Sequence, residues 1–243
     1  MNSYGLIGKN ITYSFSEAYF SKKFKIESIY NTVYKTFDLQ DLSQFPKLLQ
    51  DTTLKGLNVT IPYKEAIIPF LDQLSPEAKK IKAVNVVKFK NGQLIGHNSD
   101  VYGFEQSFIK NLKPYHQKAL ILGTGGASKA IQYVLKKHNI PFQIVSRQLS
   151  SNIISYDCIT QELLSEHLVI INCTPLGTFP NTHQKPPIPY QFLTKNHYLY
   201  DLVYNPCKTL FMEEGLKKNA TVKNGLKMLE LQAEKAWEIW QSK

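Results

Sequence analysis

A glycine-rich turn between an apolar strand and a helix constrains the fold of this chain more than any other feature. Residues 119–122 are apolar and run directly into the turn, and a segment with helical spacing of apolar residues follows. This order is that of the first unit of a dinucleotide-binding fold, in which a helix N-terminus and free backbone N–H groups hold a pyrophosphate. A glycine-rich turn without a ligand remains the alternative. The candidate cofactor-binding residues of the turn are Gly123, Thr124, Gly125, Gly126, Ala127 and Ser128.

The only arginine of the chain follows the next predicted strand, residues 142–145. Arg147 stands about 20 residues after the turn, where NAD-binding folds place an acid for the ribose 2′-hydroxyl. A guanidinium suits a 2′-phosphate instead. We therefore expect NADP rather than NAD, with Arg147 among its ligands; a solvated surface arginine is the alternative.

Strands and helices alternate along the whole chain, which predicts an α/β fold. In the second half, apolar strands at 119–122, 142–145, 169–173 and 198–201 alternate with helices, a pattern typical of a parallel sheet covered on both faces. In the first half, strands at 4–7, 33–38 and 57–59 precede a hairpin around Asn91-Gly92. Helical spacing covers 41–51 and 62–70.

Two long helices, predicted over 100–112 and 226–240, are candidate connections between two domains. We expect an N-terminal α/β substrate domain with a mainly parallel sheet, made of residues 1–100 and 226–243. The second domain, 101–225, would be a Rossmann-like NADP-binding domain. We expect the active site in the cleft between them.

Composition and charge argue against several classes of function. The 243 residues have a formal net charge of +10, but the lysines are scattered and arginine, the residue preferred for reading bases, is nearly absent. No apolar run approaches the 18 or so residues of a membrane span, and the N-terminus lacks a signal-peptide pattern. Three dispersed cysteines predict neither a disulfide framework nor a metal site. We expect a cytoplasmic protein that binds neither nucleic acid nor membrane.

Polar residues gather at the predicted strand ends of the first half. They include hydroxyls, amides, a carboxylate and one amine, a set that suits a small polyhydroxylated ligand. The alternative is that they are helix caps and turn residues, with Ser16 as an N-cap and Asn98 and Asp100 capping the next helix. The residues are Ser14, Ser16, Asn58, Thr60, Lys64, Asn85, Asn98 and Asp100.

These segments resemble the shikimate dehydrogenases, and the resemblance extends in order over nearly the whole chain. The most specific match is residues 58–64, which read as the family's NVTxPxK motif. The others are Ser14-Phe15-Ser16, Ala83-Val84-Asn85, 96–103 (GxNTDxxG), the turn 123–128, 172–177 (NxTxxG), 201–209 (DxxYxPxxT), and Gly225 with Gln232.

The resemblance implies a role for each matching residue. Ser14 and Ser16 would bind the substrate carboxylate, and Lys64 and Asp100 would be the catalytic pair. The ring hydroxyls would be held by Thr60, Asn85, Asp100 and Gln232, with Tyr204 beside the substrate. Thr174 would bind the cofactor, and Leu202 and Gly225 would lie near the nicotinamide. Ser151 stands where the family often has a second basic residue, so the preference for NADP could be less strict.

The implied activity is the reversible NADPH-dependent reduction of 3-dehydroshikimate to shikimate, in chorismate and aromatic amino-acid biosynthesis. An alcohol that loses a hydride must also lose its hydroxyl proton, which requires a positioned base, and in the reverse direction a charged Lys64 can donate that proton. Two alternatives remain: a quinate/shikimate dehydrogenase with relaxed NAD/NADP use, and a non-catalytic NADP-binding regulator on the same scaffold. Monomer and homodimer are both open.

Overall fold

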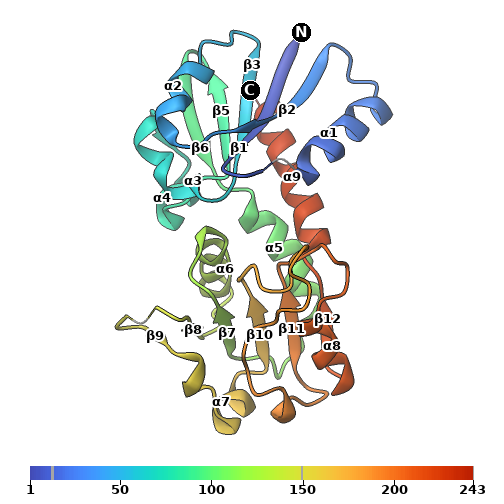
Figure 1. Cartoon of the computed structure of the whole chain (residues 1–243). Coiled ribbons are helices and arrows are strands. Elements are labelled where there is room, and N and C mark those ends of the chain that lie inside the picture. The colour runs from blue at the N-terminus through green and yellow to red at the C-terminus, as the bar shows by residue number, and fades with distance from the viewer. Residues whose placement is uncertain (12–13, 149, 243) are drawn as a thin grey trace. The chain divides into compact units, whose positions relative to one another are not determined.

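The chain divides into two compact units, each built around one six-stranded sheet (Figure 1). The computed structural model describes residues 1–11, 14–148 and 150–242. Unit 1 comprises Met1–Ser99 and Ala233–Lys243, and unit 2 comprises Asp100–Gln232. The chain thus crosses between units after Ser99 and again inside its last helix. The predicted α/β class is confirmed, since both units combine helices with sheets rich in parallel pairs.

Unit 1 contains a mixed sheet in which parallel pairs predominate. Its strand order is β2-β1-β3-β5-β6-β4; β3–β5 and β5–β6 are antiparallel, and the other pairs are parallel. Its elements are β1 (Asn2–Gly8), α1 (Phe15–Ile26), β2 (Thr32–Asp38), η1 (Leu42–Gln44), α2 (Phe45–Leu48), β3 (Leu54–Val59), α3 (Tyr63–Ala66), η2 (Ile68–Phe70), β4 (Gln73–Leu74), α4 (Pro76–Ile81), β5 (Val86–Lys90), β6 (Gln93–His97) and the C-terminal part of α9 (Leu226–Gln241).

The sheet of unit 1 is covered on both faces. Phe45, Tyr63 and Ile67 pack on one face, and Phe20 from α1 and Trp240 from α9 pack on the other. The Trp240 indole donates a hydrogen bond to the Val87 carbonyl at 3.1 Å. A Cβ at Gly56 would lie 2.3 Å from the indole nitrogen, so only glycine lets this ring lie against β3.

Unit 2 has an all-parallel sheet with strand order β12-β11-β10-β7-β8-β9. Phe104 and Phe108 of α5 pack on Tyr198 and Tyr200 on one face. Its elements are α5 (Asp100–Phe108), η3 (Ile109–Asn111), β7 (Ala119–Leu122), α6 (Gly126–Lys137), β8 (Phe142–Val145), β9 (Ile153–Ile154), η4 (Tyr156–Cys158), α7 (Gln161–Glu166), β10 (Val169–Asn172), η5 (Tyr190–Phe192), β11 (Tyr198–Asp201), α8 (Leu210–Lys217), β12 (Thr221–Lys223) and the first part of α9.

The strand order of unit 2 contains one reversal point. From β7 the chain proceeds outward to β8 and β9, and then it returns to β10 on the other side of β7. Connections that leave adjacent strands in opposite directions open a crevice at the carboxyl edge of a parallel sheet, where ligands bind in such folds. The loops after β7 and β10 therefore define the expected cofactor edge.

Side-chain caps fix where several helices begin. Ser75 accepts the Ala78 N–H at 3.2 Å, with Pro76 at the first helical position of α4, and Thr209 accepts the Met212 N–H at 3.3 Å. Within the part of the chain that the structure describes, no helix has the length and apolar character needed to span a bilayer.

Candidate functional site

The turn after β7 contains one glycine whose backbone conformation requires glycine and one glycine that leaves open space beside it. Gly123 has φ of +102°, and a Cβ there would lie 3.0 Å from the Thr174 Cγ2 methyl. Gly125 has φ of −64°, and a Cβ there would meet nothing within 4 Å. Gly123 therefore lets the turn pack against the loop after β10, whereas Gly125 keeps the approach to the N-terminus of α6 clear.

The N-terminus of α6 suits an anionic ligand. Its N-cap, Gly125, provides no side-chain hydrogen bond, and the helix runs for 12 residues, so the N–H groups and dipole of its first turn can act on a phosphate. Gly126 and Ala127 form that first turn, and Thr124 is exposed before it. Ser128 is fully buried and accepts a hydrogen bond from Gln132 at 3.1 Å, so this small side chain packs between helix and sheet.

Arg147 lies at the carboxyl end of β8, beside β7, as the sequence predicts for a 2′-phosphate ligand. Its side chain is exposed, and the preceding Ser146 is held to β9 by a hydrogen bond from its N–H to the Ile154 carbonyl at 3.0 Å. Burial raises the pKa of the Tyr156 phenol, and the positive charge of Arg147 opposes that rise. Ser151, where the family often has a second cation, is exposed on the same β8–β9 connection.

Buried polar residues at the ends of β10 and β11 hold the loops of the cofactor edge. The Asn172 amide donates to Asp201 Oδ1 at 2.9 Å, and its own oxygen accepts from the Thr174 N–H at 3.0 Å and hydroxyl at 2.6 Å. Thr209 donates to Asp201 Oδ2 at 2.5 Å, and the Val203 N–H to Oδ1 at 3.0 Å. This network fixes Thr174, a predicted cofactor residue, next to the glycine turn.

Asp201 is fully buried, and burial raises its pKa to about 6 although its hydrogen bonds oppose the shift. Neither Asn172 nor Asp201 has a role that the sequence alone predicts. The available signal was a polar residue at the end of a strand that is otherwise continuously apolar. In a buried sheet, such a residue must find hydrogen-bond partners.

Leu202 and Gly225 are immediate neighbours beyond the carboxyl ends of β11 and β12. A Cβ at Gly225 would lie 2.1 Å from the Leu202 carbonyl oxygen, and the Gly225 N–H donates to the Val203 carbonyl at 3.1 Å. Tyr204 follows on the same loop, and partial burial raises the pKa of its phenol. The two residues expected near the nicotinamide are thus brought together.

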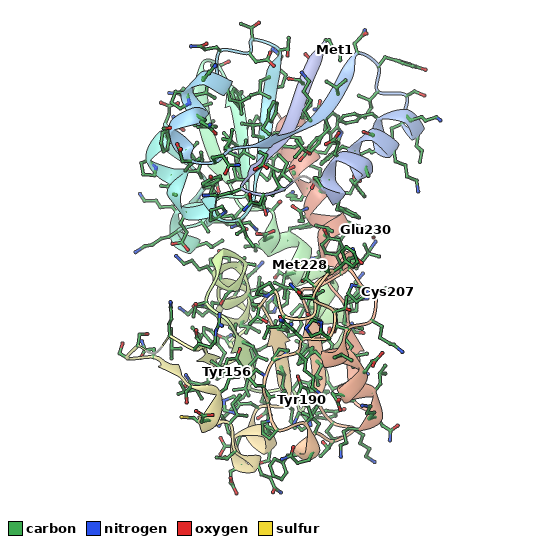
Figure 2. All side chains as sticks on the ribbon, in the orientation of Figure 1. Met1, Tyr156, Tyr190, Cys207, Met228 and Glu230 are labelled. Atoms are coloured by element: carbon green, nitrogen blue, oxygen red, sulfur yellow. The ribbon has the colours of Figure 1, made fainter. Side chains whose placement is uncertain are left out.

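Asp100 and Gln232, both predicted to hold ring hydroxyls, lie on helices that pack together within unit 2. Gly103 of α5 allows this packing, because a Cβ there would lie 2.5 Å from the carbonyl of Met228 (labelled in Figure 2) and 3.0 Å from Gln232 Cβ. Asp100 lies one turn before Gly103 and is buried. Gln232 is buried as well, and its amide donates to the Leu229 carbonyl at 3.1 Å.

Thr60 and Lys64 lie close together in unit 1, Thr60 in the turn after β3 and Lys64 in the short helix α3. The Thr60 N–H donates to the Ile7 carbonyl at 2.9 Å, and the Thr60 carbonyl accepts from the Tyr63 N–H at 2.8 Å, which forms a tight turn. Lys64 is half-buried, and its carbonyl accepts from the Val84 N–H at 2.7 Å. The backbone at Lys64 is therefore fixed next to the segment that leads to Asn85.

Asn85 holds the backbone in place just before Asp100. It is buried, its oxygen accepts from the Ser99 N–H at 2.7 Å, and its amide donates to the Ser99 hydroxyl at 3.0 Å. Because Ser99 precedes Asp100 directly, Asn85 sets where α5 starts. The Asn98 amide donates to the Ala83 carbonyl at 2.9 Å, which fixes the same turn.

The two serines differ in environment. Ser14, not Ser16, is the N-cap of α1, accepting the Glu17 N–H at 3.4 Å, so the capping alternative for Ser16 was wrong by two residues. Ser16 is buried in the first turn of α1. Tyr34 of β2 is buried as well, and its phenol donates to Asn58 Oδ1 at 2.7 Å. Tyr34 is not among the residues predicted from the sequence. The available signal was a tyrosine at an inward position of a strand, where its hydroxyl needs a hydrogen-bond partner.

Comparisons with known proteins agree on one family. Residues 6–87 match the family model described as the shikimate dehydrogenase substrate binding domain. A shikimate dehydrogenase (NADP(+)) of Clostridium botulinum is 38% identical over 251 residues, covering 99% of this chain and 96% of that protein.

Solved structures give the same result. A shikimate 5-dehydrogenase from Thermus thermophilus in complex with NADP(H) and shikimate has a TM-score of 0.86 and 29% identity, covering 99% of this chain and 94% of that one. One from Listeria monocytogenes in complex with shikimate and NAD has a TM-score of 0.87 and 26% identity, covering 100% and 92%. The predicted resemblance is confirmed at nearly full length, and the chain belongs to the shikimate dehydrogenase family.

Proposed function

We propose that this chain catalyses the reversible NADPH-dependent reduction of 3-dehydroshikimate to shikimate, within the shikimate pathway to chorismate and the aromatic amino acids. The observation that carries the proposal is the 38% identity to an NADP(+) shikimate dehydrogenase over 99% of the chain. The reaction reduces a ring ketone to a secondary alcohol, and it consumes one hydride and one proton.

The proposed chemistry divides between cofactor and protein. When bound, NADPH supplies the hydride to the ketone carbon. Lys64, as an ammonium, donates the proton to the ketone oxygen, and Asp100 orients that oxygen and the lysine. In the oxidative direction neutral Lys64 takes the proton back. Ser14 and Ser16 bind the carboxylate, Thr60, Asn85 and Gln232 hold the ring hydroxyls, and Tyr204 lies beside the substrate.

The residues on the carboxyl edge of unit 2 fit a dinucleotide. The open side at Gly125 and the N-terminus of α6 suit the pyrophosphate, and Arg147 suits a 2′-phosphate. Leu202 and Gly225 would lie against the nicotinamide, and Thr174 at the junction of the two loops. With Ser151 in place of a second cation, the selectivity for NADP rests on one guanidinium.

The first test is absorbance at 340 nm with purified protein, shikimate, and either NADP or NAD. We expect reduction of NADP, and a loss of turnover of about 10²–10⁴-fold in Lys64→Ala. Lys55→Ala, an exposed lysine of the same unit, is the matched control and should keep full activity. Wild-type turnover in Lys64→Ala would refute the assigned proton donor.

Two alternatives make different predictions in the same assay. A quinate/shikimate dehydrogenase would turn over quinate and would use NAD as well as NADP. A regulator would bind NADP without turnover on either substrate. The retained proton donor Lys64 and the complete polar set favour the enzyme. We place the protein in the cytoplasm, as a monomer or homodimer, on the sequence argument alone.

A further inference from the structure

We infer that Glu17 lowers the affinity for the substrate carboxylate, because it places a fixed negative charge beside the two serines that bind that group. The inference rests on the proposed function, since it assumes that Ser14 and Ser16 are the carboxylate ligands. Glu17 directly follows Ser16 in the chain and is the acidic residue of the first turn of α1. It is not among the predicted site residues.

The backbone of Glu17 orients the hydroxyl of Ser14. Ser14 is the N-cap of α1, and its oxygen accepts the Glu17 N–H at 3.4 Å. A hydroxyl has one proton to donate and two lone pairs with which to accept. Because the cap occupies a lone pair, the proton of Ser14 stays available for a carboxylate oxygen. The N–H of Glu17 therefore supports the role that the proposed function gives to Ser14.

The carboxylate of Glu17 is held at the sheet of unit 1. Its Oε2 accepts a hydrogen bond from the Thr36 hydroxyl of β2 at 2.5 Å, a short distance that is typical of a hydroxyl donating to a carboxylate. Burial raises the pKa of the Tyr34 phenol on the same strand, and the negative charge of Glu17 adds to that rise. The charge thus has a defined position at the N-terminal end of α1.

This charge opposes the binding of a second carboxylate. The Cα atoms of Ser16 and Glu17 are about 3.8 Å apart, so a carboxylate on the Ser16 hydroxyl lies within about one Debye length of the Glu17 side chain. Neither Ser14 nor Ser16 carries a charge that offsets the repulsion. A negative side chain in the first turn also cancels part of the positive helix dipole, which would otherwise favour the substrate carboxylate.

The alternative is that Glu17 only stabilises its helix. Ser14 and Glu17 have the spacing of a capping box, and an acidic residue in the first turn stabilises a helix. The two explanations predict opposite effects on the KM for shikimate. Loss of a stabilising residue leaves that KM unchanged or raises it, whereas loss of an opposing charge lowers it.

Removal of the charge alone tests the inference. Glu17→Gln keeps the backbone N–H for Ser14 and a side-chain oxygen for Thr36. In about 50 mM salt and at saturating NADP, we expect the KM for shikimate to fall about two- to fivefold. The kcat and the KM for NADP should change less than about twofold, because neither depends on the carboxylate of the substrate. A KM for shikimate that is unchanged or raised would overturn the inference.

Salt provides a readout that a purely structural role would not move. In about 1 M salt the Debye length falls to about 3 Å, so the KM values of the wild type and Glu17→Gln should converge. A KM ratio that stays the same at both salt concentrations would mean that the charge of Glu17 is not responsible.

A matched control separates a fixed charge from a change in net charge. Glu77 also lies in the first turn of a helix of unit 1, α4, behind a serine N-cap, Ser75. That helix carries no predicted substrate residue. Glu77→Gln should therefore leave the KM for shikimate unchanged, and an equal fall in both variants would overturn the inference.

Ser16→Ala tells failure of this inference from failure of the proposed function. If Ser16 binds the carboxylate, this variant should raise the KM for shikimate, and a normal KM would refute the carboxylate assignment itself. A raised KM in Ser16→Ala together with an unchanged KM in Glu17→Gln would overturn only the role of Glu17.

Discussion

At the residue scale, Asp201 makes folding stability depend on pH. Its pKa rises from 3.8 to about 6 on burial, so between these values the native state keeps a proton that the unfolded state has lost. The contribution of Asp201 to the free energy of unfolding is fully present below about pH 4 and is lost as the pH rises through 6. Two pKa units correspond to about 3 kcal/mol.

Asp201→Asn tests this dependence, because an amide cannot ionise. Between pH 4 and 7 the free energy of unfolding of the wild type should fall by about 3 kcal/mol relative to the variant. Urea unfolding followed by far-UV circular dichroism at each pH gives both values. Two pH profiles that run parallel would show that folding does not raise the pKa of the Asp201 carboxyl.

Arg147 should decide between cofactors without affecting the reaction. The loss of a charged hydrogen bond in Arg147→Gln should raise the KM for NADP about 10- to 100-fold and leave the KM for NAD unchanged. Lys195→Gln, an exposed lysine of the same unit, controls for the lost charge. A similar rise for both cofactors would mean that Arg147 does not bind the 2′-phosphate.

The residues whose positions in the fold could be predicted are those whose signal is local in sequence. The glycine turn and Arg147 could be placed because a strand and its loop determine where they lie. Tyr34 and Asp201 could not be assigned, because their roles depend on partners that are distant in sequence, such as Asn58 for Tyr34 and Asn172 for Asp201. In a sequence, a buried polar group appears only as a polar residue among apolar ones, with nothing to identify its partner.

At the element scale, the turn between β7 and α6 contains two glycines whose substitution by alanine should have different effects, one on stability and the other on NADP binding. Gly123→Ala forces a side chain into φ of +102° and against Thr174, so it should destabilise unit 2 by about 1–3 kcal/mol. Gly125→Ala has an ordinary φ and open space, so stability should stay within about 0.5 kcal/mol. The added methyl would instead occupy the approach to the helix N-terminus and weaken NADP binding.

Thermal unfolding and NADP titration of both variants separate the two effects. Stable protein with weaker binding is expected for Gly125→Ala, and reduced stability for Gly123→Ala. Unchanged NADP affinity in Gly125→Ala would place the pyrophosphate elsewhere.

Strands of unit 2 were predicted more accurately than short helices of unit 1. The strands at 119–122, 142–145 and 198–201 have the predicted bounds, since continuous apolar runs end sharply. The helices predicted over 41–51 and 62–70 are instead broken into short α and 3₁₀ turns. Pro46 and Pro69 explain part of this, because each lacks the N–H that would continue a helix.

At the scale of the whole molecule, unit 1 is discontinuous in sequence. Its aromatic cluster takes Ala233, Ala236 and Trp240 from the end of the chain, while unit 2 is one continuous segment. The two crossings lie after Ser99 and Gln232, against expected boundaries after 100 and 225. The difference of seven residues arises because the second crossing falls inside α9, where no break in the sequence pattern marks it.

In a chain that ends at Gln232, unit 1 should therefore unfold and unit 2 should stay folded. We expect amide hydrogen-exchange protection to disappear from β1 and β3 and to persist in β7, β10 and β11. A chain that ends at Gln241, which keeps Trp240, serves as the control. Equal loss of protection in both units would show that they unfold as one.

Both chain ends belong to unit 1 (Figure 1), which has a consequence for how the protein is made. A ribosome that has finished Ser99 must still synthesise all of residues 100–232 before the helical segment that covers one face of the first sheet emerges. At 5–20 residues per second this interval lasts roughly 7 to 27 s. During that time Phe20, Phe24 and Tyr34 have no Trp240 to cover them, and the nascent chain presents an apolar sheet face to the chaperones of the cell.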